Sequence, residues 1–139
     1  MNIVRWLSRE ASNGSQIICL QEFQLTELAT RLGSVTCYYN PKDQIHGSVT
    51  FVHKDLVEKY TITQKVIVKG EIQAIMFRND STPFAIINAH ISPHSNWDKS
   101  RDLKTIKDNG PTFSRVFLAG DLNYIMLETE RICLKDGTP

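Results

Sequence analysis

The stretch VFLAGDLN, residues 116–123, begins as an apolar run and ends in polar residues. The run predicts a last buried strand over residues 115–119. Gly120 permits a sharp turn where that strand ends. Asp121 and Asn123 follow it two residues apart, a spacing that puts both side chains on one face. This strand end is therefore a candidate functional site.

Two other apolar runs end in the same way. Residues 16–21 (QIICLQ) predict a buried strand that Glu22 follows directly. Residues 84–89 (FAIINA) predict another, at whose end Asn88 and His90 share a face. Magnesium prefers oxygen ligands and takes only one or two protein carboxylates, leaving positions for water and phosphate. Three strand ends with these side chains therefore favour a metal-dependent phosphodiesterase.

Each of these side chains has a role that its chemistry allows. Glu22 can supply the metal ligand, and Asp121 can hold or polarise the attacking water. Asn123 and Asn88 can orient that water or donate hydrogen bonds to phosphate. A protonated His90 can stabilise charge on the phosphorane-like transition state.

The rest of the chain is read mostly as strands. A hairpin is predicted at Lys69-Gly70, a break at residues 40–43, and a loop at residues 11–15. These features indicate a layered α/β or α+β protein with a mostly antiparallel sheet content. Further strands are expected over residues 34–39, 47–53, 60–68 and 71–78, and helices over residues 26–32, ended by Gly33, and 96–107, capped by Ser95.

Composition sets the remaining limits. A chain of 139 residues fits one domain, residues 1–139, and its 41% hydrophobic content suits a globular protein. The net charge of +1 means that any site for a polyanion has to be local. The 3 cysteines form no zinc-binding pattern, and Cys19 is expected to be a buried free thiol. No signal peptide or membrane span is predicted, so an intracellular protein, cytoplasmic or nuclear, is expected. The oligomeric state is left open.

Three stretches together resemble a known superfamily. They are LQE at residues 20–22, NAH at 88–90 followed by Pro93, and GDLN at 120–123. This set is similar to the motifs of the endonuclease/exonuclease/phosphatase superfamily, which includes deoxyribonuclease I, apurinic endonucleases, sphingomyelinases and LINE-type retrotransposon endonucleases. The resemblance covers about residues 16–125. It implies a deoxyribonuclease I-like α/β sandwich of two mostly antiparallel sheets flanked by helices.

The resemblance also implies an activity and roles for the site residues. The implied function is endonucleolytic hydrolysis of nucleic acid, with DNA favoured, using Mg²⁺ or Mn²⁺ in its place. Glu22 would be the metal ligand, and Asp121 would align or deprotonate the water. Asn123 and His90 would contact the phosphate, while Asn88 would support its strand end.

Two family features are missing from the sequence. The family's first strand ends in an asparagine that helps to hold the metal, whereas here Trp6 is followed by Leu7. The family's closing Ser-Asp-His-like motif is not found in residues 1–139. The sandwich is therefore expected to be incomplete at one edge, with apolar strand surface exposed. Two alternatives stay open: an inactive family remnant that acts as a binding module, and a hydrolase of a lipid or small-molecule phosphoester.

Overall fold

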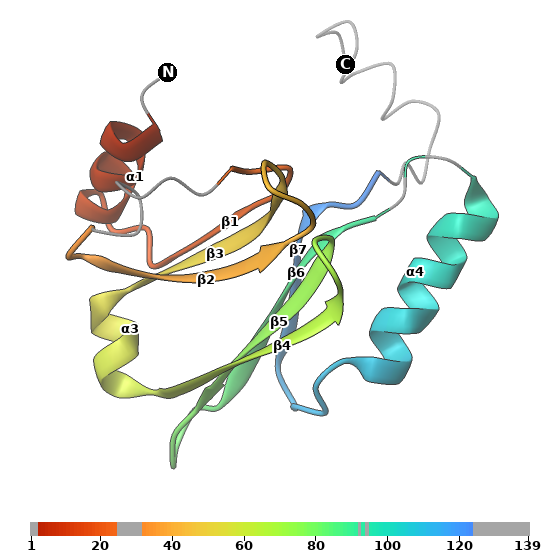
Figure 1. The fold of residues 1–139 in the computed structure, drawn as a ribbon. Coiled ribbons are helices and arrows are strands. Elements are labelled where there is room, and N and C mark those ends of the chain that lie inside the picture. Colours follow the sequence, from red (N-terminus) through yellow and green to blue (C-terminus); the bar gives the residue numbers. More distant parts are fainter. Residues whose placement is uncertain (1–2, 25–31, 92, 94, 124–139) are drawn as a thin grey trace, which may run out of the picture.

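A computed structural model describes residues 3–24, 32–91, 93 and 95–123, which form two β-sheets and three helices (Figure 1). The first sheet has the strand order β1-β3-β2 and is antiparallel throughout. The second has the order β4-β5-β6-β7 and is antiparallel except for the parallel pair β6–β7. The elements are α1 (Ile3–Ser12), β1 (Ile17–Leu20), β2 (Val35–Pro41), β3 (Gly47–His53), α3 (Lys54–Lys59), β4 (Thr61–Val68), β5 (Ile72–Arg78), β6 (Phe84–His90), α4 (Asn96–Asn109) and β7 (Val116–Asp121).

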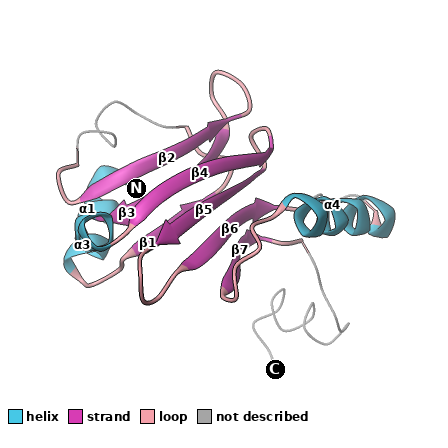
Figure 2. Ribbon diagram, turned by 90° about the horizontal axis from the view of Figure 1, so that it is seen from below, coloured by secondary structure: helices cyan, strands magenta, loops and turns pink. Residues whose placement is uncertain are grey.

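The two sheets stack face to face, and helices cover their outer faces (Figures 1 and 2). Between the sheets, Val52 of β3 packs with Ile75, Phe77 and Ile86 of the second sheet. On the outer face of the first sheet, α1 packs against a separate cluster, and Ile106 of α4 contacts a third cluster on the second sheet. The expected α/β sandwich of two mostly antiparallel sheets is therefore confirmed.

Two local predictions from the sequence are confirmed, the turn between β4 and β5 and the start of α4. The β4–β5 hairpin turns at Gly70, whose φ of +75° suits glycine. Helix α4 begins after Ser95, whose hydroxyl accepts a hydrogen bond from the backbone N–H of Asp98 at 3.1 Å. Gly110 then caps the end of that helix.

Other expectations were wrong. The expected break at residues 40–43 does not end β2, which continues to Pro41; a proline is tolerated there because β2 is an edge strand. The strand expected over residues 115–119 forms as β7 but is largely exposed, because it is the edge strand of the described sheet. Helices α1 and α3 were not anticipated, and α1 extends into the expected loop at residues 11–15. Most of the helix expected over residues 26–32 lies outside the described residues.

Buried polar side chains connect the two sheets. Asn88 of β6 is fully buried, and its Nδ2 donates to the carbonyl of Val49 at 3.0 Å and to Oγ1 of Thr50 at 3.2 Å. Gln73 of β5 is also buried and donates to the carbonyl of Tyr38 at 3.0 Å and to the same Thr50 hydroxyl at 3.2 Å. These bonds fix how the sheets align, because shifting one sheet would leave buried polar groups unpaired.

No helix in the described part of the chain has both the length and the apolar character needed to span a lipid bilayer.

Candidate active site

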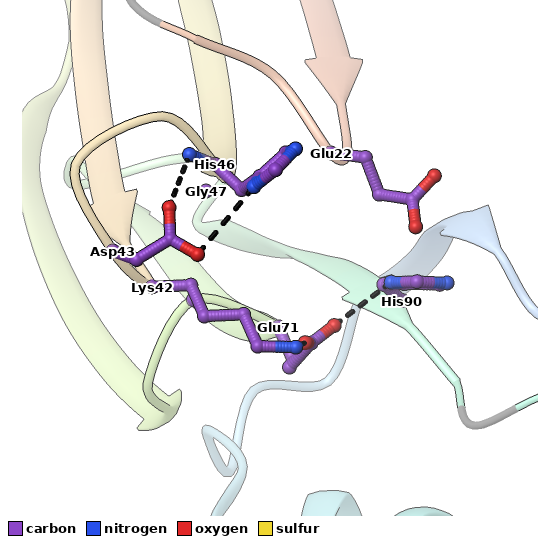
Figure 3. Close-up of a pocket in the computed structure, with 8 residues that line it drawn as sticks. Glu22, Lys42, Asp43, His46, Gly47, Glu71 and His90 are labelled. Carbon is purple, nitrogen blue, oxygen red and sulfur yellow. Dashed lines mark hydrogen bonds and ion pairs between the residues drawn. The ribbon is translucent and has the colours of Figure 1, made fainter.

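A cleft of about 250 Å³ opens where the first sheet meets the β4–β5 turn and the end of β6 (Figure 3). The end of β1, the β2–β3 turn and the start of β5 all contribute side chains to it. Three carboxylates and one ammonium group line it, so its charge favours a cation. The lining residues are Glu22, Lys42, Asp43, His46, Gly47, Gly70, Glu71 and His90.

Glu22 stands at the exit of β1, where the sequence predicted a metal ligand. Its φ of +50° lies in the left-handed region, which is uncommon for a residue with a side chain and costs about 1–3 kcal/mol. The next residue, Phe23, donates its backbone N–H to the carbonyl of Gly47 at 2.8 Å and fixes this turn. In Figure 3 the Glu22 carboxylate points toward the side of the cleft that holds His90. The strained turn therefore directs an exposed carboxylate at the imidazole.

His90 ends β6 and is held by Glu71. Its Nδ1 lies 2.8 Å from Oε2 of Glu71, and the two side chains are 15% and 22% exposed. The other carboxylate oxygen of Glu71 accepts a hydrogen bond from Nζ of Lys42 at 2.6 Å. That hydrogen bond, with the negative charge of Glu71, is the main reason that the pKa of Lys42 is raised. One carboxylate thus holds both a cationic side chain and the imidazole.

Glu71 was not singled out from the sequence, although strand pairing contains a signal for it. In the β5–β6 ladder, Ile72 is opposite Ala89, so the preceding Glu71 comes opposite His90. The backbone confirms this, since the N–H of His90 donates to the carbonyl of Glu71 at 2.8 Å. Pairing the strand expected over residues 71–78 antiparallel with the next strand would have placed Glu71 opposite His90.

Lys42 is held near Glu71 because the side chain of the preceding Asn40 bonds the β2–β3 turn to the β4–β5 turn, a set of contacts called here the Asn40 clamp. Asn40 is 1% exposed, and its Oδ1 accepts the backbone N–H of Gly70 at 2.8 Å while its Nδ2 donates to the carbonyl of Val68 at 3.1 Å. Gly70 packs so closely that a Cβ at this position would collide with Cα and Cβ of Lys42. A glycine is therefore required here on two grounds, its positive φ and this contact.

The neighbouring acidic residue of the cleft, Asp43, is kept ionised by its turn. The backbone N–H groups of Ile45 and His46 donate to its Oδ1 at 2.8 Å and 2.7 Å. These two bonds lower the pKa of the Asp43 carboxyl. Asp43 therefore contributes a negative charge to the cleft at neutral pH.

Asp121 and Asn123 lie at the end of β7, next to His90. In the parallel β6–β7 ladder, His90 and Asp121 are register partners, although Asp121 is not among the residues that line the cleft. Oδ1 of Asp121 accepts the backbone N–H of Asn123 at 3.1 Å, and Nδ2 of Asn123 donates to the carbonyl of Ile91 at 2.9 Å. Gly120 makes this end possible, because a Cβ there would collide with the carbonyl of Ala89.

Asn88 differs from the other predicted site residues because it is completely buried. Besides its bonds to β3, its Oδ1 accepts a hydrogen bond from Nε2 of Gln21 at 2.6 Å. Asn88 therefore holds the end of β6 in place from the interior of the protein. Its direct contact with substrate stays a prediction.

The donor set fits a metal ion held by few protein ligands. Among the described residues no group of three or more His, Cys, Asp and Glu side chains is arranged to hold a metal. Magnesium does not need such a cage, since it keeps several waters and binds through one or two carboxylates. No described residue hydrogen-bonds to the Glu22 carboxylate, whereas Glu71 is already bonded to Lys42 and His90. Of these two carboxylates, Glu22 is the one that no described residue occupies.

The fold and this cleft define a two-sheet α/β sandwich with an acidic site at the strand ends. The sequence matches no protein-family model and none of the curated proteins. Solved structures do match. The endonuclease domain of TRAS1, a telomere-specific non-LTR retrotransposon, has a TM-score of 0.65 and 14% identity over 89% of this chain and 55% of its own. D. rerio TDP2, complexed with a single-strand DNA product, has a TM-score of 0.60 and 15% identity over 93% of this chain and 56% of its own.

A third match is ANGEL2, a 2',3'-cyclic phosphatase, with a TM-score of 0.59 and 14% identity over 95% of this chain. The chain thus spans between 46% and 56% of the length of these three structures. It shares the deoxyribonuclease I-like fold that the resemblance of its motifs implied.

Proposed function

We propose that this chain carries the site of a divalent-metal-dependent phosphodiester hydrolase that cleaves nucleic acid, with DNA favoured over RNA. The observation that carries the proposal is the His90–Glu71 pair, with its 2.8 Å contact, in the same cleft as the Glu22 carboxylate. An imidazole held by a carboxylate and directed at a cation site is an arrangement suited to binding a phosphate.

His90 is proposed to contact the scissile phosphate. Its Nδ1 is engaged by Glu71, so Nε2 is the nitrogen that remains for a phosphate oxygen. An N–H at Nε2 can donate to a phosphate oxygen and stabilise negative charge as it develops there.

Asp121 is proposed to orient the attacking water. One of its oxygens is engaged by the backbone N–H of Asn123, which holds the carboxylate in place. The second oxygen is then left to accept a proton from water, and Asp121 is exposed where a water can reach it. Nδ2 of Asn123 is bonded to Ile91, so Oδ1 and the remaining N–H of this amide are its groups for water or phosphate.

Glu22 is proposed to hold Mg²⁺, or Mn²⁺ in its place. When bound, such an ion neutralises charge on a phosphate oxygen. Glu22 suits this role because its carboxylate faces a cleft whose lining carries more carboxylates than ammonium groups (Figure 3). A nucleic-acid substrate is supported by the neighbours' printed activities, an endonuclease domain and a protein complexed with single-strand DNA. Intracellular action, in cytoplasm or nucleus, is supported by Cys19, which forms no disulfide.

The test is magnesium-dependent nicking of supercoiled plasmid by the purified protein. Nicking is expected, and EDTA and Asp121→Ala should each abolish it. Asp80→Ala, which removes an exposed carboxylate from the β5–β6 turn, is the matched control and should nick normally. Protein that is folded by circular dichroism yet does not nick would overturn the nuclease proposal. It would favour a binding module or a hydrolase of a different phosphoester.

A further inference from the structure

Lys42 supplies the ammonium group of the cleft, and the chain around it fixes where that group lies. The start of its side chain packs against Gly70, and the Asn40 clamp holds the two turns together. Its Nζ reaches Oε1 of Glu71 at 2.6 Å. Long side chains lose rotamer freedom when they bind a ligand. For Lys42, part of that ordering takes place when the protein folds.

Lys42 keeps hydrogen-bonding capacity that the described residues do not use. An ammonium group carries three N–H donors, and among the described residues Glu71 is the acceptor for Nζ. The adjacent Asp43 is turned to its own loop, where its oxygens are engaged by Ile45 and His46. The hydrogen bond and charge of Glu71 raise the pKa of Lys42, so the ammonium group stays charged at neutral pH. The Lys42 side chain lines the cleft and is 58% exposed, so its other N–H groups can reach a ligand there.

Lys42 and His90 lie on opposite sides of one carboxylate (Figure 3). Oε1 of Glu71 bonds to Nζ of Lys42, and its Oε2 contacts Nδ1 of His90. The imidazole nitrogen that remains for a phosphate, Nε2, points away from Glu71 and hence away from Lys42. The carboxylate and the width of the imidazole ring therefore separate Nζ from Nε2. Two donors so placed suit two different phosphate groups better than a single one.

We propose that Lys42 binds the phosphate next to the scissile one and so makes the site selective for a polynucleotide over a phosphoester with a single phosphate. This rests on the proposed function, in which Nε2 of His90 contacts the scissile phosphate. A nucleic-acid strand presents a phosphate at every nucleotide, so one strand can occupy both places. Apart from imidazoles, the other charged side chains that line the cleft are carboxylates, so among these residues Lys42 is the one suited to a second phosphate.

The alternative is that Lys42 acts only through Glu71, by holding the carboxylate that holds His90. A positioning role of that kind affects the cleavage of every substrate equally. A phosphate contact affects only those substrates that have a second phosphate. Comparing two substrates therefore separates the two roles.

The first test uses Lys42→Gln, which keeps the Cβ and Cγ that pack against Gly70 but removes the charge. Its kcat/KM is measured on a short DNA duplex and on bis(p-nitrophenyl) phosphate, which has one phosphate. The loss on the duplex should be at least about ten-fold larger than the loss on the small diester, mainly through KM, as for a hydrogen bond to a charged group. Lys42→Arg should restore most of the activity on the duplex.

Lys59→Gln is the matched control. It removes the same charge from the exposed end of α3, which follows the end of β3 that lies opposite the cleft-lining Gly47 (Figure 1). Its kcat/KM should equal that of the wild-type protein on both substrates.

The second test needs no hydrolysis. Binding of a fluorescently labelled duplex is followed by anisotropy in EDTA over a range of salt concentrations. The logarithm of the affinity falls linearly with the logarithm of the salt concentration, by about 0.9 for each phosphate that is neutralised. Lys42→Gln should reduce this slope by about one such contact, and Lys59→Gln should leave it unchanged.

Equal losses on the two substrates, or an unchanged salt slope in folded Lys42→Gln protein, would overturn the proposal and leave Lys42 as a positioning residue. Wild-type protein that binds the duplex but hydrolyses neither substrate would contradict the proposed function, while the salt slope would still decide the Lys42 contact. Wild-type protein that hydrolyses the small diester but does not bind the duplex would overturn the Lys42 proposal alone.

Discussion

Nδ1 of His90 lies 2.8 Å from Oε2 of Glu71, across the first register position beyond the β5–β6 ladder. This contact joins the start of one strand to the end of the next. It also fixes which imidazole nitrogen remains for a ligand. Through its second oxygen, Glu71 reaches Lys42 of the β2–β3 turn at 2.6 Å (Figure 3). Three segments distant in sequence thus share one carboxylate.

Replacing that carboxylate should reduce activity while the fold is kept. Glu71→Gln preserves the size of the side chain but removes the carboxylate that holds Nδ1 of His90. The turnover number should fall by roughly ten- to a thousand-fold, in the range of general acid–base and positioning effects. Plasmid nicking under single-turnover conditions measures this. Glu58→Gln, on the exposed side of α3, is the control. A loss below three-fold for Glu71→Gln would contradict the role.

Glu22 should determine the requirement for metal. Glu22→Gln keeps a neutral oxygen but removes the charge that magnesium prefers, so the Mg²⁺ concentration that gives half-maximal activity should rise at least ten-fold. Binding of Mn²⁺, followed by electron paramagnetic resonance without substrate, should weaken in parallel. Unchanged Mn²⁺ binding in Glu22→Gln would show that the ion binds elsewhere.

Gly70 and Gly14 offer a matched pair of glycines. Both have positive φ, +75° and +96°, so alanine is strained at each, at a cost of about 1 kcal/mol. Only at Gly70 would the new Cβ also collide with Lys42; around Gly14 there is nothing within 4 Å. Gly70→Ala should therefore lower both stability and activity, and Gly14→Ala stability alone. Urea denaturation and plasmid nicking separate the two effects. Equal nicking activities of Gly70→Ala and Gly14→Ala would show that activity does not depend on the position of the β4–β5 turn.

Asn88→Ala should destabilise the protein strongly. It removes a fully buried amide that bonds to Val49, Thr50 and Gln21, and leaves their groups without a partner. Each orphaned group costs about 1–3 kcal/mol, so the free energy of unfolding should fall by about 2–4 kcal/mol. Asn96→Ala, at the exposed start of α4, should change it by less than about 0.5 kcal/mol. Chemical denaturation measures the change in the free energy of unfolding for both variants. Similar changes would argue against a stabilising role of the Asn88 hydrogen bonds between the sheets.

Burial of Cys19 makes stability depend on pH in the alkaline range. Desolvation raises the pKa of its thiol from 9.0 to about 11, against a smaller lowering effect of its hydrogen bond to Thr50. The unfolded thiol ionises first, so the free energy of unfolding should fall as the pH rises from 9 to 11 and be unaffected below 9. The expected loss is about 2 kcal/mol. Cys19→Ala should lack this component, and parallel pH profiles of the two proteins would contradict the prediction.

The three strand ends could be recognised from the sequence because each combines an apolar run with polar residues at its exit. That pattern is local. In the structure Glu22 and His90 line one cleft, and Asp121 lies beside His90. Glu71 escaped notice because a lone carboxylate at the start of an expected strand is unremarkable. Its significance arises only from pairing with β6.

The exposure of β7 could not be read from its composition. An apolar run such as residues 116–119 predicts burial because most strands of this kind have neighbours on both sides. Whether a second neighbour is present depends on the whole sheet and not on the strand itself. In the described sheet β6 is the partner on one side, and Val116 to Leu118 are exposed. The short helix α3 was missed for a related reason, since 6 residues carry too little periodicity to detect.

The Asn40 clamp sets an order of events for a chain leaving the ribosome. All three described strands of the first sheet have been synthesised by residue 53, but the amide of Asn40 then has no Val68 or Gly70 to bond. Glu71 and His90 also follow later, so an emerging chain presents Glu22 without the partners of its cleft. Such long-range closures are slow compared with local folding. The proposed hydrolytic centre is therefore withheld during translation until the second sheet has docked.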